Sequence, residues 1–178
     1  MEKIENTEMI ERIREEYGIE PLDDNIDCKN VLVTGAVLAT DPELTENYKK
    51  LSEIITCEDY YLRINSPLAT MKFKGTDEEK YVRAMNLLHE ADVIIAEMSN
   101  VSTGQGMELQ EATHLGIPIL VIARTGSKIS GLVRGCPNVR NILFYDDIYD
   151  VAEDIQRFIK EELDLKYGSG EEKKNLVR

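Results

Sequence analysis

The sequence is poor in basic residues and has no long apolar run. Its 178 residues hold 21 Lys or Arg against 34 Asp or Glu, a formal net charge of −13. This balance argues against a broad basic surface for nucleic acid or an anionic membrane. No run approaches the roughly 18 apolar residues of a membrane span, and no signal peptide precedes the first acidic residues. We therefore expect a cytoplasmic protein with no nucleic-acid or membrane partner.

Metal-binding and cofactor-binding patterns are also missing. Cys28, Cys57 and Cys136 are widely spaced and form no C-x-x-C pair, which favours reduced thiols over a disulfide framework or a zinc site. His89 and His114 lack partners at ligand spacing,. No G-x-G-x-x-G follows the first apolar segment, which counts against a dinucleotide fold. We therefore predict neither a metal nor a cofactor.

Short apolar segments alternate with amphipathic ones along the chain. Strands are predicted at 30–35, 60–65, 92–98, 117–123 and 141–145, and the main helices at 41–56, 76–92, 102–115 and 147–165,. The segments 66–75 and 125–135 are predicted as a binding loop and as a glycine-rich basic loop or short helix.

This alternation predicts a three-layer α/β/α sandwich that is Rossmann-like or flavodoxin-like. Its five-stranded parallel sheet should have the order 2-1-3-4-5. In that order ligands bind at the C-terminal ends of strands one and three. Gly35 and Ala36 lie at the end of the first strand, and the segment 98–108 lies at the end of the third.

The chain divides into three parts. Residues 1–27 are predicted to be an acidic extension with a short helix at 7–17, residues 28–166 the α/β domain, and residues 167–178 a mobile tail,.

The helix after the third strand begins unusually. Ser102 and Gln105 form a capping-box pattern, but Gly104 and Gly106 each cost about 1 kcal/mol relative to alanine inside a helix. At a helix start, backbone N–H groups that no Cβ covers can bind a phosphate or another anion. Glu108 follows Gly104 by one helical turn, so the two residues share one face of the helix. Spacing alone leaves open an alternative. The two glycines would then be simple loop residues between two elements, and Glu108 would be a solvated helix residue.

Four segments together resemble a known family. GAV after the first strand, ADVIIAEMS, STGQGMEL and SGLVRG resemble the nucleoside 2-deoxyribosyltransferase superfamily, and within it the 2′-deoxynucleoside 5′-phosphate N-hydrolases. The likeness covers residues 30–145. It implies that Glu108 is a nucleophile that displaces the base and forms a glycosyl ester, as in a retaining glycosidase.

The resemblance also implies the substrate contacts. Ser102, Gly104 and Gly106 would receive the 5′-phosphate, and Gly35 with Ala36 would form the turn below the sugar. Ser130 would reach the phosphate from a neighbouring subunit, which implies a homodimer or higher homo-oligomer. The alternative for Ser130 is a helix N-cap.

Departures from the family pattern keep other functions open. Ala84 stands where the family usually has an aspartate that helps the leaving base, and Leu32 and Ala36 replace a tyrosine and a serine. The leading hypothesis is an N-glycosidase that hydrolyses nucleoside 5′-monophosphates. The alternatives are base exchange between deoxynucleosides and a catalytically silent nucleotide-binding module.

Overall fold

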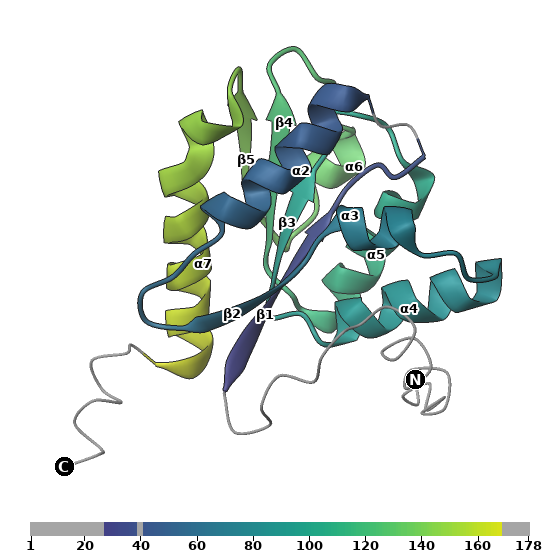
Figure 1. Cartoon of the computed structure of the whole chain (residues 1–178). Coiled ribbons are helices and arrows are strands. Elements are labelled where there is room, and N and C mark those ends of the chain that lie inside the picture. The colour runs from purple at the N-terminus through teal and green to yellow at the C-terminus, as the bar shows by residue number, and fades with distance from the viewer. Residues whose placement is uncertain (1–26, 39–40, 169–178) are drawn as a thin grey trace.

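Five parallel strands form one sheet in the order β2-β1-β3-β4-β5, as predicted. The computed structural model describes residues 27–38 and 41–168 (Figure 1). The strands are β1 (Cys28–Thr34), β2 (Tyr61–Asn65), β3 (Val93–Glu97), β4 (Ile119–Arg124) and β5 (Val139–Tyr145). Every residue of β3 is buried, as expected for the middle strand of a parallel sheet with helices on both faces.

Helices connect successive strands. They are α2 (Pro42–Ile54), α3 (Pro67–Lys72), α4 (Asp77–His89), α5 (Thr103–Leu115), α6 (Gly131–Arg134), the 3-10 helix η1 (Ile148–Val151) and α7 (Ala152–Tyr167). Local sequence signals determine where several helices begin and end. Thr76 and Glu79 form a capping box at the start of α4, and Gly116 ends α5 with a φ of 75°,. Within residues 27–38 and 41–168 no helix is long and apolar enough to cross a bilayer.

The sheet separates two hydrophobic cores. On one face, Leu44, Tyr48 and Leu51 of α2 pack with Ile155 and Ile159 of α7. On the other face, the core joins Leu88 of α4 and Leu109 and Ala112 of α5 to the sheet. Figure 1 shows α2 and α7 on the side opposite α4 and α5. The predicted three-layer sandwich is therefore confirmed.

Two local predictions were wrong. The segment predicted as a loop at 66–75 contains α3, whose start is fixed by the Ser66 side chain, which accepts a hydrogen bond from the Leu68 amide, and by Pro67 in the first turn,. The last helix, α7, runs through Tyr167, one residue into the predicted tail. Tyr167 Oη donates a 2.6 Å hydrogen bond to Asp92 Oδ1, which holds this helix end against the start of β3.

Other predictions for the termini lie outside the described residues. These are the acidic extension with its helix at 7–17 and the mobile tail beyond Gly168.

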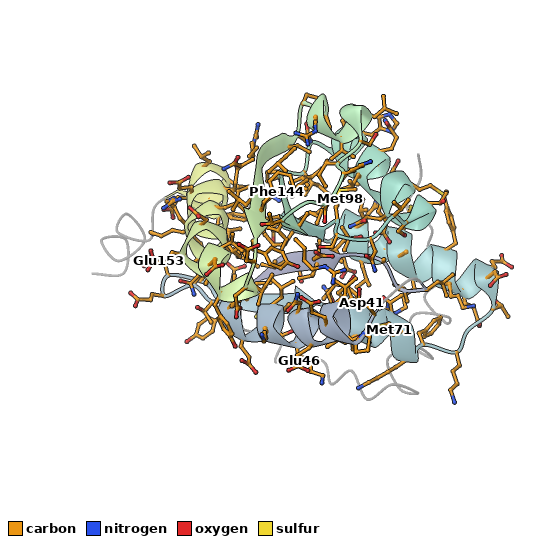
Figure 2. All side chains as sticks on the ribbon, turned by 90° about the horizontal axis from the view of Figure 1, so that it is seen from above. Asp41, Glu46, Met71, Met98, Phe144 and Glu153 are labelled. Carbon is orange, nitrogen blue, oxygen red and sulfur yellow. The ribbon has the colours of Figure 1, made fainter. Side chains whose placement is uncertain are left out.

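The chain leaves β1 and β3 toward opposite faces of the sheet. After β1 it enters α2, and after β3 it enters α5, although the two strands are neighbours. Figure 2 looks down on the molecule from above and labels Asp41, the N-cap of α2, and Met98, which follows β3. This divergence opens a crevice at the strand ends, where ligands bind in folds of this kind.

Candidate active site

Glu108 faces a cleft at the ends of β1 and β2. The residue lies in the second turn of α5, and the cleft is open to solvent. The lining residues come from the ends of two strands and from α3, α4 and α5: Leu32, Val33, Thr34, Gly35, Val37, Asn65, Ser66, Pro67, Thr70, Phe73, Lys80, Arg83, Ala84, Leu87 and Glu108. Glu108 is the only carboxylate in this set.

A hydrogen bond from the end of β1 holds the Glu108 carboxylate. Thr34 Oγ1 donates to Glu108 Oε2, and Thr34 is 4% exposed. Burial raises the pKa of the Glu108 carboxyl above its usual range, and the Thr34 hydrogen bond opposes this rise because it favours the ionised form,. Glu108 is therefore a partly desolvated carboxylate in a fixed orientation, which suits a nucleophile.

Gln105 fastens the start of α5 to the sheet. Ser102 accepts a hydrogen bond from the Gln105 amide at 3.3 Å, as the capping-box pattern predicted. The Gln105 side chain does not complete that box. Its Nε2 donates to the main-chain oxygens of Thr34 at 3.1 Å and Glu97 at 2.9 Å, because the fully buried amide lies over the ends of β1 and β3. Gln105 thereby positions the helix that carries Glu108.

A second buried carboxylate, Glu97, lies at the end of β3. It is 0% exposed and accepts hydrogen bonds from the Ser99 hydroxyl and from Tyr145 Oη, the latter at 2.8 Å. Burial raises its pKa, while these donors oppose the rise. Ser99 Oγ in turn accepts the Arg124 amide at 2.8 Å. This network fixes the turn between β3 and α5, and it does not line the cleft.

Four of the six predicted substrate-binding residues line one of two hollows, whereas Ala36 and Gly104 line neither of these two. Gly35 lines the cleft with Glu108. Ser102, Gly106 and Ser130 line another hollow, between α5 and α6. Gly106 and Glu108 face different ways because two positions on a helix are about 200° apart. Ser130 also caps α6 by accepting the Leu132 amide at 3.3 Å.

The glycines differ in what surrounds them. A Cβ on Gly35 would lie 2.2 Å from Tyr48 Oη, which itself donates a 2.9 Å hydrogen bond to the oxygen of buried Ala36. Gly35 is therefore needed for the turn after β1. A Cβ on Gly104 would have Ser102 Oγ as its nearest neighbour, at 4.0 Å, and one on Gly106 would meet nothing within 4 Å. The fold itself does not require glycine at these two helix positions.

The two histidines share one carboxylate. His89 Nε2 lies 3.4 Å from Glu111 Oε1, and His114 Nδ1 lies 3.5 Å from Glu111 Oε2. Within the described ranges, no group of three His, Cys, Asp or Glu residues is arranged to hold a metal ion.

Several residues that form or support the site were missed from the sequence. Thr34 and Glu97 are polar residues inside apolar strands, which was a usable signal because buried polar groups need partners. Asn65 and Arg83 carried no such signal, because only the packing of α3 and α4 against the ends of β1 and β2 brings them to the cleft with Glu108.

Relatives are found among nucleotide N-hydrolases. A protein of Methanosarcina barkeri named 2′-deoxynucleoside 5′-phosphate N-hydrolase 1 is 33% identical over 93 residues, which are 52% of this chain and 58% of that protein. The protein of the same name from Methanosarcina mazei is 28% identical over 137 residues, 74% of this chain and 84% of that protein. The rat 5-hydroxymethyl-dUMP N-hydrolase is 35% identical over 74 residues, 40% and 45% of the two chains.

The chain is a relative of the nucleoside 5′-phosphate N-hydrolases. This finding confirms the resemblance seen in the sequence. The match spans about half the length of the M. barkeri and rat proteins. No family model matches the chain.

Two solved structures share the fold of this chain. The CMP N-glycosidase of Clostridium botulinum superposes with a TM-score of 0.57 at 17% identity, over 73% of this chain and 99% of that one. A 2-deoxyribosyltransferase from Bacillus psychrosaccharolyticus superposes with a TM-score of 0.51 at 16% identity, over 69% and 90%. At such low identity the likeness shows the fold alone.

Proposed function

We propose that the chain is an N-glycosidase that hydrolyses the bond between base and sugar in (deoxy)nucleoside 5′-monophosphates. The observation that carries this proposal is the Glu108 carboxylate, which is oriented by Thr34 and faces an open cleft at the C-terminal ends of β1 and β2. Its relatives are named for the hydrolysis of such nucleotides.

The chemistry proceeds in two displacements. Glu108 attacks the anomeric carbon, a C–O bond forms, and the C–N bond breaks with its electron pair leaving on the base. Water then hydrolyses the glycosyl ester, which releases the sugar 5-phosphate and restores the carboxylate. This route needs Glu108 ionised at the moment of attack, and the Thr34 hydrogen bond favours that form.

The start of α5 is the proposed phosphate site. The first amides of a helix and its dipole attract anions, and the open space at Gly104 lets a phosphate approach the backbone. Ser102, Gly104 and Gly106 are the residues proposed here, and Gly35 with Ala36 is proposed to support the sugar.

A second copy of the chain is proposed to supply Ser130. Within one chain, Ser130 lines the hollow on the Gly106 side of α5 and not the cleft with Glu108. In the proposed homodimer, Ser130 reaches that cleft from the partner subunit.

We place this activity in the cytoplasm. The three cysteines, Cys28, Cys57 and Cys136, are all free, which agrees with a reducing compartment.

The test is a chromatographic assay for free base. The protein is incubated with ribo- and deoxyribonucleoside 5′-monophosphates and with the matching nucleosides. Base released from a monophosphate but not from its nucleoside supports the proposal. Release that requires an added acceptor base would instead identify base exchange. Tight nucleotide binding with no product from any substrate would identify a silent binding module.

A further inference from the structure

Arg124, the last residue of β4, pairs with two carboxylates close to the proposed phosphate site. We propose that Arg124 offsets the negative charge of Asp41 and Glu43, and that this cancellation of charge lets a phosphate dianion approach the start of α5. The inference rests on the proposed function, and it assigns to that function a residue that governs affinity for phosphorylated ligands. Because Arg124 acts through the two carboxylates, it is a positioning residue and not a catalytic one.

Both the main chain and the side chain of Arg124 contact the turn between β3 and α5. Its backbone amide donates to Ser99 Oγ at 2.8 Å, and its Nη2 donates to Asn100 Oδ1 at 3.2 Å. Asn100 and Ser102 line the same hollow. Two residues of extended chain span at most about 7 Å, so the guanidinium lies close to the Ser102 cap of α5.

The same guanidinium reaches across the crevice to the start of α2. Its Nη2 lies 2.8 Å from Asp41 Oδ2, and its Nη1 lies 3.0 Å from Glu43 Oε2. These two partners lie 83 and 81 positions away along the chain. One cation at the end of β4 thereby joins the segments that follow β1 and β3, the two strands whose ends form the crevice.

The two helices that begin at this crevice differ in the charge of their first turns. Asp41 caps α2 by accepting the Leu44 amide at 2.7 Å, and Glu43 lies in the first turn. The structure describes α5 along its whole length, and this helix has the neutral cap Ser102 and no acidic residue in its first turn. The start of α2 therefore holds its own anions, whereas the start of α5 does not.

Asp41 and Glu43 would repel a nearby phosphate if no cation offset them. The Leu44 amide and the Arg124 guanidinium hold the pKa of Asp41 below its usual range, so Asp41 is ionised at neutral pH. With Arg124 the three side chains carry one net negative charge, and without it they would carry two. Charges closer than the Debye length of about 8 Å are only partly screened at physiological salt. The loss of Arg124 would therefore weaken the binding of a dianion at Ser102.

A role in folding alone explains these ion pairs less well. The side chains of Asp41 and Glu43 are 42% and 63% exposed, and exposed pairs contribute little to stability. Asp41 also caps α2 through its other carboxylate oxygen, Oδ1, so the cap does not need Arg124. What the arginine adds at this place is therefore mainly its positive charge.

The experiment measures the binding of deoxyribose 5-phosphate by calorimetry, together with kcat and KM on a deoxynucleoside 5′-monophosphate. At low salt, Arg124→Gln should bind the sugar phosphate about tenfold more weakly than the wild type. It should raise KM by a similar factor and leave kcat nearly unchanged. The ratio to the wild type should shrink at high salt, because salt screens exposed charges. Arg124→Lys, which keeps the charge, should retain most of the affinity.

The decisive variant combines Arg124→Gln with Glu43→Gln. It returns the local charge to the wild-type value, so we expect it to recover most of the lost affinity. An Arg124 that held the phosphate directly could not be replaced in this way, and a double variant as weak as Arg124→Gln would overturn the inference. Glu43→Gln alone should strengthen binding about threefold. Unchanged or weaker binding in that variant would also overturn the inference, whether or not Arg124→Gln folds.

Arg140→Gln is the matched control. It removes a cation from another exposed ion pair, with Glu162 at 2.9 Å, on the neighbouring strand β5. Its affinity for the sugar phosphate should stay within about twofold of the wild type. A loss equal to that of Arg124→Gln would show an effect of net charge alone and would overturn the assignment to Arg124.

Further outcomes separate this inference from the proposed function. If the wild type releases base and Arg124→Gln binds the sugar phosphate normally, the hydrolase stands and only this inference is overturned. If the wild type binds the sugar phosphate but releases no base, the hydrolase is refuted, and the binding measurements still decide the role of Arg124. A wild type that does not bind the sugar phosphate refutes the phosphate site and this inference with it.

Discussion

Thr34 Oγ1 donates a hydrogen bond to Glu108 Oε2 and so joins the last residue of β1 to the second turn of α5. The two residues are 74 positions apart in the chain. Because Thr34 is buried and its main-chain oxygen also accepts from Gln105, the carboxylate is held by the rigid part of the sheet. This contact sets both the orientation of Glu108 and the balance between its protonated and ionised forms.

Thr34→Val should shift the pH dependence of base release to higher pH. Burial raises the pKa of Glu108, and Thr34 opposes that rise. Removing the hydroxyl therefore raises this pKa further, and the ionised nucleophile forms only at higher pH. The measurement is kcat/KM against pH for both proteins. Thr34→Ser, which keeps the hydroxyl, is the control, and an unchanged acidic limb in Thr34→Val would contradict the assignment.

Glu108→Gln should make the folded protein more stable near neutral pH. A carboxyl whose pKa is raised by folding binds its proton longer in the native state than in the unfolded state. Its contribution to stability therefore falls as pH rises from the unfolded pKa through the folded one. Each pKa unit is worth about 1.4 kcal/mol, and the amide variant escapes this cost. Urea unfolding at several pH values should show a gain that disappears in acid.

Gly104→Ala should raise stability and weaken nucleotide binding. Its Cβ would have no neighbour closer than 4.0 Å, so alanine should stabilise α5 by up to about 1 kcal/mol. The same methyl group would block a phosphate at the helix start. Thermal unfolding and the inhibition constant of a sugar 5-phosphate measure the two effects. A stabilised variant with normal phosphate affinity would remove Gly104 from the phosphate site.

Mixed subunits test whether Ser130 acts across an interface. A dimer of one Glu108→Gln subunit and one Ser130→Ala subunit contains one intact site if Ser130 is supplied by the partner. Refolding the two inactive variants together in equal amounts should then restore about a quarter of wild-type activity, because half the dimers are mixed. Activity no greater than the average of the separate variants would place Ser130 outside the partner's site.

The sequence predicted the sheet and its order because burial on both faces makes β1, β3 and β4 continuous apolar runs, such as 92–98. The short helix α3 was taken for a loop because its six residues are too few to show a helical period. Its start signal, Ser66 followed by Pro67, was the usable evidence.

The site was predictable where it depends on local pattern. Ser102, Gly104 and Glu108 share one helix start, and their spacing could be read directly. The contacts made by Thr34 and by the Gln105 side chain depend on where β1 lies beside β3, which spacing along the chain does not reveal. The same holds for Arg83, which lines the cleft and donates to Thr70 of α3, 13 positions earlier in the chain.

The most direct test of the account is base release by the wild-type protein and by Glu108→Gln, measured side by side on a deoxynucleoside 5′-monophosphate. We expect the wild type to release base and sugar phosphate in equal amounts, and Glu108→Gln to remain folded and release none. A folded Glu108→Gln protein that releases base at the wild-type rate would contradict the central claim that this carboxylate attacks the sugar.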